Sequence, residues 1–276
     1  VTVTRLIATV FTAAEAGIIP HQLIKAGKTL SQAASFYGEL TGVAFTLLMV
    51  PSTLTFSLAT SLLPAVSEAR SRGNKSSLIQ RTSDALGVTL LAGVPSVLIL
   101  FFWGPAFAEQ LFKARHAGEI LQILAFGGLF LYLAQTSTGV LQGIGCVKAI
   151  FVNSLISGIL RLAGIYYLGS HPADGMTGIA LSYAASFIIL AFLNLAFIKI
   201  WAGLNFQPAF FLRLGFSSFV LIQLLMRSRS LVENSAICLV GMTLLLGAVF
   251  FALLYLTGDK YSRLILQQLV KSYKTR

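Results

Sequence analysis

The sequence alternates long apolar stretches with short polar connections, and this alternation is the feature that most limits the fold. A bilayer core about 30 Å thick needs roughly 20 apolar residues per helix, and eight stretches approach or exceed that length. They cover residues 3–19, 36–66, 85–112, 119–141, 149–168, 176–198, 209–226 and 235–257. Only 11% of the residues are charged, against about 25% in soluble domains. We therefore predict an all-α, polytopic membrane protein with about eight transmembrane helices.

The basic residues are unevenly distributed between the connections, which predicts an orientation. If the first residue lies inside, thirteen of the 20 Lys and Arg residues are cytoplasmic, six are external and one lies within a span. Because membrane proteins retain basic loops in the cytoplasm, we predict that both termini of this segment are cytoplasmic. The net charge of +11 comes from scattered residues that form no basic face or nucleic-acid motif. No nucleic-acid partner is therefore predicted.

Three ionisable side chains in the predicted spans are the main functional candidates, because a charge inside a membrane is costly. Glu15 and Glu39 lie near the predicted outer ends of the first and second spans, and Arg161 lies in the outer half of the fifth. All three are then at similar depth, so two acids can compensate one base.

Two interpretations of these three residues stay open. In the functional one, Arg161 lines a water-filled cavity and binds an anionic group of a substrate, because a guanidinium makes paired hydrogen bonds with phosphate. A glutamate then binds a coupling cation or a second substrate group. In the structural one, Arg161 forms an ion pair between helices, or the glutamates reach toward the membrane interface.

Four further polar residues complete the predicted cavity set. Gln135 and Gln142 lie in the fourth predicted span, Asn153 in the fifth, and Arg5 at the cytoplasmic start of the first. Amides can hydrogen-bond sugar hydroxyls, although they more often join helices at a gain of about 1 kcal/mol. Arg5 is equally interpreted as an interfacial anchor.

The apolar stretch 36–66 contains two prolines, Pro51 and Pro64, which interrupt helices. Hydroxyl groups and neighbouring helices can satisfy the carbonyls that a proline leaves free. Ser52, Thr53 and Ser61 lie beside these prolines. We therefore predict helix bends at Pro51 and Pro64, which shape a cavity and its cytoplasmic mouth.

Motifs of the common enzyme classes are absent from the sequence. It contains no GxSxG, HExxH, P-loop or GxGxxG pattern. The two cysteines, Cys146 and Cys238, have no CxxC spacing and no neighbouring His. We predict a protein that is not an enzyme, with no catalytic residue, no metal site and no cofactor.

Several segments together resemble the stage V sporulation protein B group of polysaccharide transporters, within the multidrug/oligosaccharidyl-lipid/polysaccharide exporter superfamily. The resemblance covers roughly residues 1–200, and its most specific part is the segment with Pro51, Pro64 and "SEA", followed by "LQGIG". Other matching segments are "RLIATVFTAAEAGIIPHQLIKAG", "ILQILAFGGLFLYLAQTSTGVLQGIG" and "GMTGIALSY".

The resemblance implies a domain organisation. Members have two lobes of helices around a central cavity, and the eight spans look like the second lobe with two appended helices. Residues 1–200 would form the six-helix lobe, 201–258 two additional transmembrane helices, and 259–276 a cytoplasmic amphipathic tail or a frayed polar end. The missing N-terminal lobe would then be a partner.

The resemblance also implies a function in the bacterial plasma membrane. We expect a flippase or exporter that moves a lipid-linked oligosaccharide or peptidoglycan precursor by alternating access, in spore cortex or cell-wall synthesis. Arg5, Glu15, Glu39 and Arg161 would be the charged residues on the cavity face, and membrane lipids would be partners. Two alternatives stay open: a cation-coupled multidrug or metabolite antiporter of the same fold, and a truncated fragment or scaffold that does not transport.

Overall fold

The computed structural model describes residues 2–172, 174–232 and 235–265, without the side chains of residues 2–8, 54, 55, 58, 59 and 115. Within these residues all regular structure is helical. The elements are α1 (Thr2–Lys25), α2 (Leu30–Gly38), η1 (Glu39–Ala44), α3 (Phe45–Thr60), α4 (Leu63–Ser71), α5 (Lys75–Phe112), α6 (Arg115–Gly143), α7 (Val147–Leu168), α8 (Gly175–Trp201), α9 (Pro208–Arg227), α10 (Arg229–Val232) and α11 (Ala236–Leu256). Residues 260–265 are also helical.

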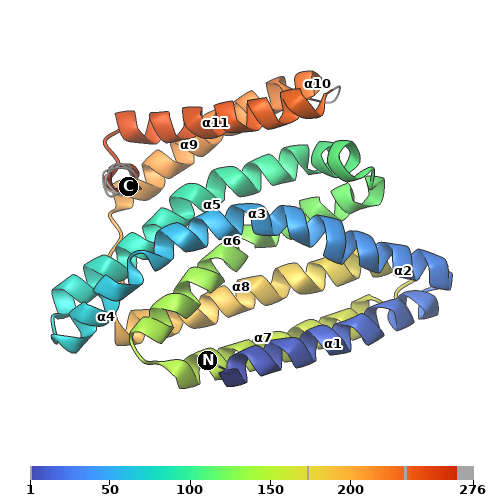
Figure 1. The fold of residues 1–276 in the computed structure, drawn as a ribbon, viewed down its shortest axis with the longest axis horizontal. Coiled ribbons are helices and arrows are strands. Elements are labelled where there is room, and N and C mark those ends of the chain that lie inside the picture. The colour runs from blue at the N-terminus through green and yellow to red at the C-terminus, as the bar shows by residue number, and fades with distance from the viewer. Residues whose placement is uncertain (1, 173, 233–234, 266–276) are drawn as a thin grey trace, which may run out of the picture.

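The long helices run back and forth along one common direction, as Figure 1 shows. Helix α6 packs against α5 and α8, α8 also packs against α7, and α1 covers α7. The connections from α1 to α2, α5 to α6 and α7 to α8 lie at one end, which we call the α5–α6 end. The connections from α4 to α5, α6 to α7 and α8 to α9 lie at the opposite end, which we call the α4–α5 end.

Seven helical segments of the described residues are long and apolar enough to cross a membrane. They confirm the prediction of an all-α, polytopic membrane protein. The eighth predicted span, residues 3–19, coincides with α1. Its crossing stays a prediction, since the side chains of its first turns lie outside the described residues.

The predicted long span 36–66 is built from four helical pieces. A π-helical segment, η1, joins α2 to α3, and the helix continues through Pro51 to Thr60. The interruption follows at Ser61 and Leu62, and Pro64 occupies the first turn of α4. A proline is well suited to a first turn, because its missing N–H would have no helical partner there. The break therefore lies just before Pro64, whereas the bend at Pro51 stays a prediction.

Local sequence signals explain where two helices begin. Thr29 and Gln32 form a reciprocal capping box at the start of α2. Before α5, the chain turns at Gly73, whose φ of +66° suits a residue without a side chain. The Asn74 side chain then accepts a hydrogen bond from the Ser77 N–H, which satisfies one free donor of the first turn.

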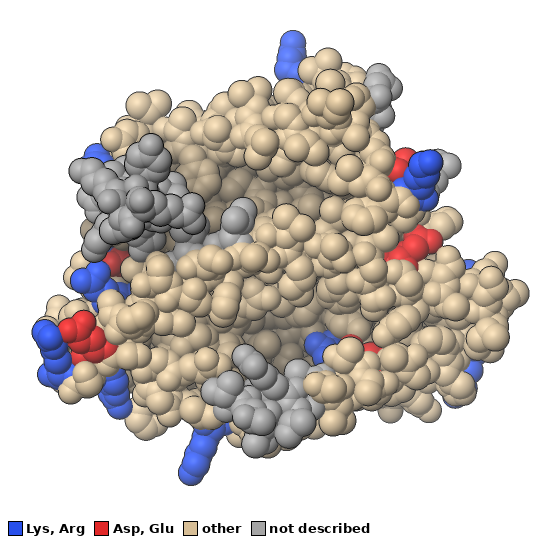
Figure 2. Space-filling model, in the orientation of Figure 1, with Lys and Arg blue, Asp and Glu red and all other residues tan. Residues whose placement is uncertain are grey.

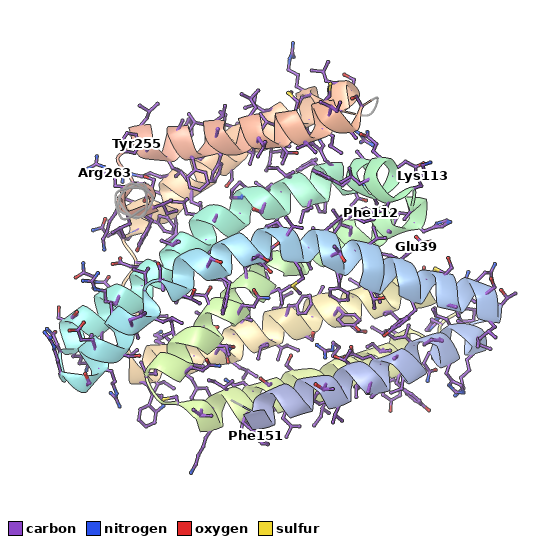
Figure 3. The ribbon with its side chains drawn as sticks, in the orientation of Figure 1. Glu39, Phe112, Lys113, Phe151, Tyr255 and Arg263 are labelled. Atoms are coloured by element: carbon purple, nitrogen blue, oxygen red, sulfur yellow. The ribbon has the colours of Figure 1, made fainter. Side chains whose placement is uncertain are left out.

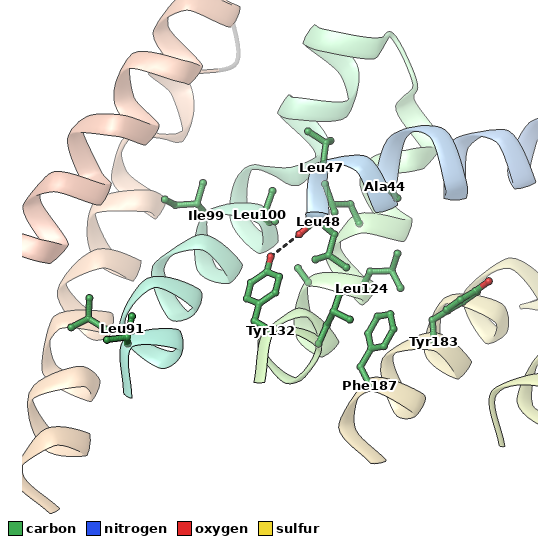
Figure 4. Packing of buried hydrophobic residues seen from close by; sticks show 14 of the residues in the cluster. Ala44, Leu47, Leu48, Leu91, Ile99, Leu100, Leu124, Tyr132, Tyr183 and Phe187 are labelled. Atoms are coloured by element: carbon green, nitrogen blue, oxygen red, sulfur yellow. Dashed lines mark hydrogen bonds between the residues drawn. The ribbon is translucent and has the colours of Figure 1, made fainter. Parts of the chain in front are cut away.

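Small residues allow α6 to pack closely in the centre of the bundle. A Cβ atom added to Gly127 would lie 2.7 Å from the Cα of Ala184 in α8. On the neighbouring face, the Tyr132 hydroxyl donates a 2.9 Å hydrogen bond to the Leu48 carbonyl of α3, as Figure 4 shows. Because Leu48 lies three residues before Pro51, this bond ties the proline-containing helix to the core.

Helices α9 and α11 pack on one another and reach the rest of the bundle through α5. Near the α4–α5 end, the backbone N–H of Asn205 donates to the Ser83 hydroxyl. Near the α5–α6 end, the Trp103 indole donates to the Leu225 carbonyl at 3.2 Å. The pair is thus attached to α5 by apolar packing, with a few polar contacts near the two ends.

Candidate functional site

The centre of the candidate site is an ion pair between α1 and α7. The Nε and Nη2 atoms of Arg161 each lie 2.6 Å from Glu15 Oε1. Arg161 lies seven residues before the end of α7, which corresponds to a depth of about 10 Å from the α5–α6 end. Only 6% of the Glu15 side chain and 19% of the Arg161 side chain are exposed. The sequence-based interpretation of an Arg161 to glutamate pair therefore describes the observed geometry.

Tyr183 of α8 completes this pair. Its hydroxyl donates a 2.7 Å hydrogen bond to Glu15 Oε2, and its ring lies under the Arg161 guanidinium at 5.2 Å. The edge of Phe45 from α3 meets the same ring at 4.9 Å between centroids. We call Glu15, Arg161 and Tyr183 the charged triad. Both carboxylate oxygens are engaged, while Nη1 of Arg161 makes no hydrogen bond to the described residues.

The charged triad lies apart from most other charges of the molecule. Figure 2 shows Lys, Arg, Asp and Glu mainly at the two ends, with blue and red atoms together in a hollow in the middle of this face. In a membrane, a charge is tolerated when it is paired or open to a water-filled cavity. The triad satisfies the first condition, and the partial exposure of Arg161 is compatible with the second.

Glu39 does not join the triad. It begins the π-helical segment, and Figure 3 shows it toward the α5–α6 end. Its Oε1 accepts a long 3.4 Å hydrogen bond from Ser35, while Oε2 is buried without a partner among the described residues. Glu39 lines a separate cavity of about 320 Å³ with Lys28 and His116. The expectation that two acids share Arg161 is therefore not met, because only Glu15 reaches it.

Asn153 lies in a buried network of side chains between three helices. Its amide donates to Asn194 Oδ1 of α8 at 2.9 Å, and the Asn194 amide donates to Thr138 Oγ1 of α6 at 3.0 Å. Asn153 and Asn194 are almost fully buried. The structure thus shows the interhelical use of this amide that the sequence left open.

The remaining predicted cavity residues lie away from the triad's contacts. The Gln135 amide reaches only the Met49 sulfur, at 3.8 Å, and its oxygen is buried with no partner among the described residues. Gln142 is exposed at the end of α6. Arg5 belongs to α1, but its side chain lies outside the described residues. The roles of these three residues stay predictions.

A second buried charge escaped the sequence analysis. Asp84 lies in the third turn of α5, and its nearly buried carboxylate accepts from Lys260 Nζ at 2.6 Å. Burial, followed by the nearby charges of Asp84 and Asp259, raises the pKa of Tyr261 to about 12. The clue in the sequence was an acid directly beside a predicted span, but its partner lies 176 positions away.

Metal binding has no visible basis in the part of the chain that the structure describes. No three His, Cys, Asp or Glu side chains gather there in a way that could hold an ion.

Comparisons with known proteins identify the family of the chain. The family described as Lipid II flippase MurJ matches residues 40–258. Stage V sporulation protein B of Bacillus subtilis (strain 168) is 31% identical over 179 residues, which are 65% of this chain and 35% of that protein. Sporulation protein YkvU of the same organism is 30% identical over 192 residues, 70% of this chain and 43% of that protein. The chain thus spans less than half the length of these curated relatives.

A solved structure has the same fold. Lipid II flippase MurJ in an inward closed conformation aligns with a TM-score of 0.58 and 18% identity, covering 77% of this chain and 47% of that chain. The resemblance inferred from the sequence is therefore confirmed. Because the family match extends over most of the chain, this multi-pass protein of bacterial membranes belongs to the lipid II flippase MurJ family, a family of transporters and not of enzymes.

Proposed function

We propose that the chain forms one lobe and two appended helices of a flippase that moves a lipid-linked oligosaccharide or peptidoglycan precursor by alternating access. The observation that carries this proposal is the charged triad, in which Arg161 forms a buried ion pair with Glu15 inside a bundle of membrane helices. The family to which the chain belongs is named for a lipid II flippase. Ionisable groups inside membranes are costly and mark substrate or ion pathways. A second lobe supplied by the complete transporter would form the opposite wall of the cavity.

Arg161 is the proposed contact for the diphosphate of the substrate. Its Nε and Nη2 donors bind Glu15, which leaves the Nη1 edge for an anion. A guanidinium binds phosphate through such parallel donors more strongly than a neutral group does. Glu15 compensates the charge of Arg161 while the cavity is empty, and Tyr183 holds Glu15 in place.

The proposed orientation places both ends of this segment in the cytoplasm. Basic connections at the α4–α5 end support it, since Arg70, Arg72 and Lys148 lie there. The charged triad then lies closer to the external end, where a translocated head group would be released. Rocking of the two lobes about the triad would expose it alternately to each side.

A peptidoglycan precursor is the proposed substrate because of the relatives. Two of them are named for sporulation, and the family is named for lipid II. A buried arginine suits a diphosphate better than the apolar, acidic cavity expected of a drug antiporter does, because a guanidinium pairs its donors with phosphate oxygens.

The test compares head-group translocation by the complete transporter with and without Arg161. In proteoliposomes that contain a fluorescent lipid-linked precursor, Arg161→Ala is expected to reduce translocation at least tenfold, since it removes the anion contact. Ser157→Ala is the matched control on the same helix, because the Ser157 hydroxyl donates to the Ser186 carbonyl and not to the triad. Translocation by Arg161→Ala at the wild-type rate would reject the proposal.

A double variant separates substrate binding from stability. Arg161→Ala alone leaves Glu15 buried and unpaired, which destabilises a protein by itself. Glu15→Gln with Arg161→Gln removes both charges and keeps similar volumes. We expect this variant to insert and fold with near-normal thermal stability, yet to translocate as poorly as Arg161→Ala. Recovery of transport together with stability would assign the triad a purely structural role.

A further inference from the structure

A second cavity, away from the charged triad, lies where α5, α9 and the C-terminal segment meet. Its volume is about 320 Å³. The lining is polar for a site beside membrane helices, with hydroxyl and amide groups from Ser76, Gln80, Asn205 and Gln207, two cations, Arg213 and Lys260, and one acid, Asp259. We call it the α5–α9 cavity. It belongs to the α4–α5 end, where Figure 3 shows Tyr255 and Arg263.

Arg213 is the cation of this cavity that has no carboxylate partner among the described residues. Its Nη1 donates to the Gly258 carbonyl at 2.9 Å. Within the described residues, no carboxylate forms an ion pair with it, whereas Arg72, Arg161 and Lys260 are all paired. The guanidinium is half-buried and carries four further N–H donors. It is therefore held in position by a backbone carbonyl while most of its donors stay unused.

The two nearby carboxylates are already engaged elsewhere. Asp84 binds Lys260 Nζ at 2.6 Å, and 46% of the Lys260 side chain remains exposed. Asp259 lines the cavity, but its Oδ2 accepts from the Ser262 N–H at the start of the last helix. Neither acid forms an ion pair with Arg213, so an anion that binds Arg213 would not displace an existing ion pair of the described residues.

The depth of the cavity matches the head-group layer of a bilayer. α9 begins at Pro208 and α11 ends at Leu256, so Arg213 lies within the first two turns of a membrane-spanning helix. On the outside of the same turns, Leu212 and Phe216 are 76% and 58% exposed. An acyl chain beside these side chains would leave its head group next to Arg213.

We propose that the α5–α9 cavity binds the head group of an anionic phospholipid, with its phosphate on Arg213. Basic pockets between helices at the cytoplasmic side are suited to anionic lipids, because that leaflet carries negative charge. Gln80 and Gln207 then hydrogen-bond the remaining head-group oxygens, and Lys260 supplies a second positive charge. The lipid would join α9 to α5 and to the C-terminal segment, independently of transport.

The test measures lipid retention by the full chain in detergent. The protein is mixed with phosphatidylglycerol or with phosphatidylcholine, and bound lipid is counted by native mass spectrometry. We expect preferential retention of phosphatidylglycerol, and about a tenfold weaker retention in Arg213→Gln. Arg227→Gln is the matched control, because Arg227 is exposed in the last turn of the same helix. Equal retention by both variants would overturn the proposal.

Two further measurements keep the test decisive. If Arg213→Gln does not fold, Gln80→Leu and Arg213→Lys replace it, with expected losses of about threefold, because one hydrogen bond or the paired geometry is removed. Full retention by both would reject the site. Inorganic phosphate at millimolar concentration is added separately, and thermal unfolding is followed. A stabilisation by phosphate as large as that by phosphatidylglycerol would show a site for free anions and overturn the lipid assignment.

Discussion

Helices α1–α8, which we propose form one lobe, and helices α9 and α11, which we propose are a pair appended to that lobe, differ in how much of their apolar surface is buried within the molecule. In the most apolar stretch of α6, which belongs to the lobe, 67% of the residues are buried within the molecule, whereas in the corresponding stretch of α11 only 22% are buried. The lobe holds a buried ion pair about 10 Å from its α5–α6 end, with Glu15 of α1 bound to Arg161 of α7. The polar contacts of α5 with α9 and with the connection before it lie near the two ends of α9, at Leu225 and Asn205.

This difference shows where each region can change shape. Interactions among buried charges lose much of their energy when one partner moves, so the lobe has few alternative arrangements. The pair is held through one neighbour, so it can shift without disturbing the triad. The proposed rocking mechanism requires lobes that move as units, and the polar contacts that join α1, α7 and α8 are compatible with such a unit.

The largest expected effect comes from breaking the ion pair of Glu15 and Arg161 in the lobe. Glu15→Ala leaves Arg161 buried and unpaired, and we expect the free energy of unfolding in mixed micelles to fall by about 3–5 kcal/mol. Glu15→Ala with Arg161→Ala should cost less than the two single changes added together. Glu39→Ala is the control, because Glu39 pairs with no base in the described chain. A similar loss in Glu39→Ala would refute the central role of the triad.

The second prediction compares close helix packing in the two regions. Gly127→Ala places a methyl group 2.7 Å from the Cα of Ala184, so α6 and α8 must separate. We expect a loss of about 1–3 kcal/mol in the free energy of unfolding. Gly241→Ala in α11 is the control, since nothing lies within 4 Å of its added methyl group. If both changes were neutral, the lobe would not be the more tightly packed region.

Much of the fold could be predicted because hydropathy reports directly on the solvent. The membrane-spanning stretches follow from the apolar residues alone, and Arg161 was recognisable because a charge inside such a stretch is rare. The π-helical segment at Glu39 was not predictable, since no residue pattern distinguishes it from an α-helix. The break before Pro64 lies close to the bend that we predicted at this residue, because a proline disfavours the helical backbone conformation of the residue before it.

The candidate site was predictable only in part. Arg161 and Glu15 were named from their depth, but depth cannot tell which of two glutamates contacts the arginine. Glu39 lies apart from Arg161, and its place in the cavity stays a prediction. Tyr183 could not be recognised from the sequence, because a tyrosine in an apolar helix does not show toward which neighbour its side chain points. Asp84 was overlooked because it stands at a span boundary, and its pairing with Lys260 depends on the tertiary fold.

The third prediction loosens one end of the appended pair. Lys260→Ala leaves Asp84 buried without its cation, and we expect a loss of about 2 kcal/mol or less, because Lys260 is half exposed and solvent already weakens the pair. The effect should be local. Hydrogen exchange is expected to rise in the first turns of α9 and stay unchanged in α7 and α8. Faster exchange throughout the lobe would contradict a separately attached pair.

The smallest effect is expected at the opposite end of the pair. Trp103→Phe removes the indole donor to the Leu225 carbonyl, and we expect the free energy of unfolding to fall by about 1 kcal/mol. Because the two attachments lie at opposite ends of α9, the losses of Trp103→Phe and Lys260→Ala should add within about 0.5 kcal/mol in the double variant. A clearly larger combined loss would mean that the attachments act together, and that the pair leaves α5 as one rigid body once both ends are free.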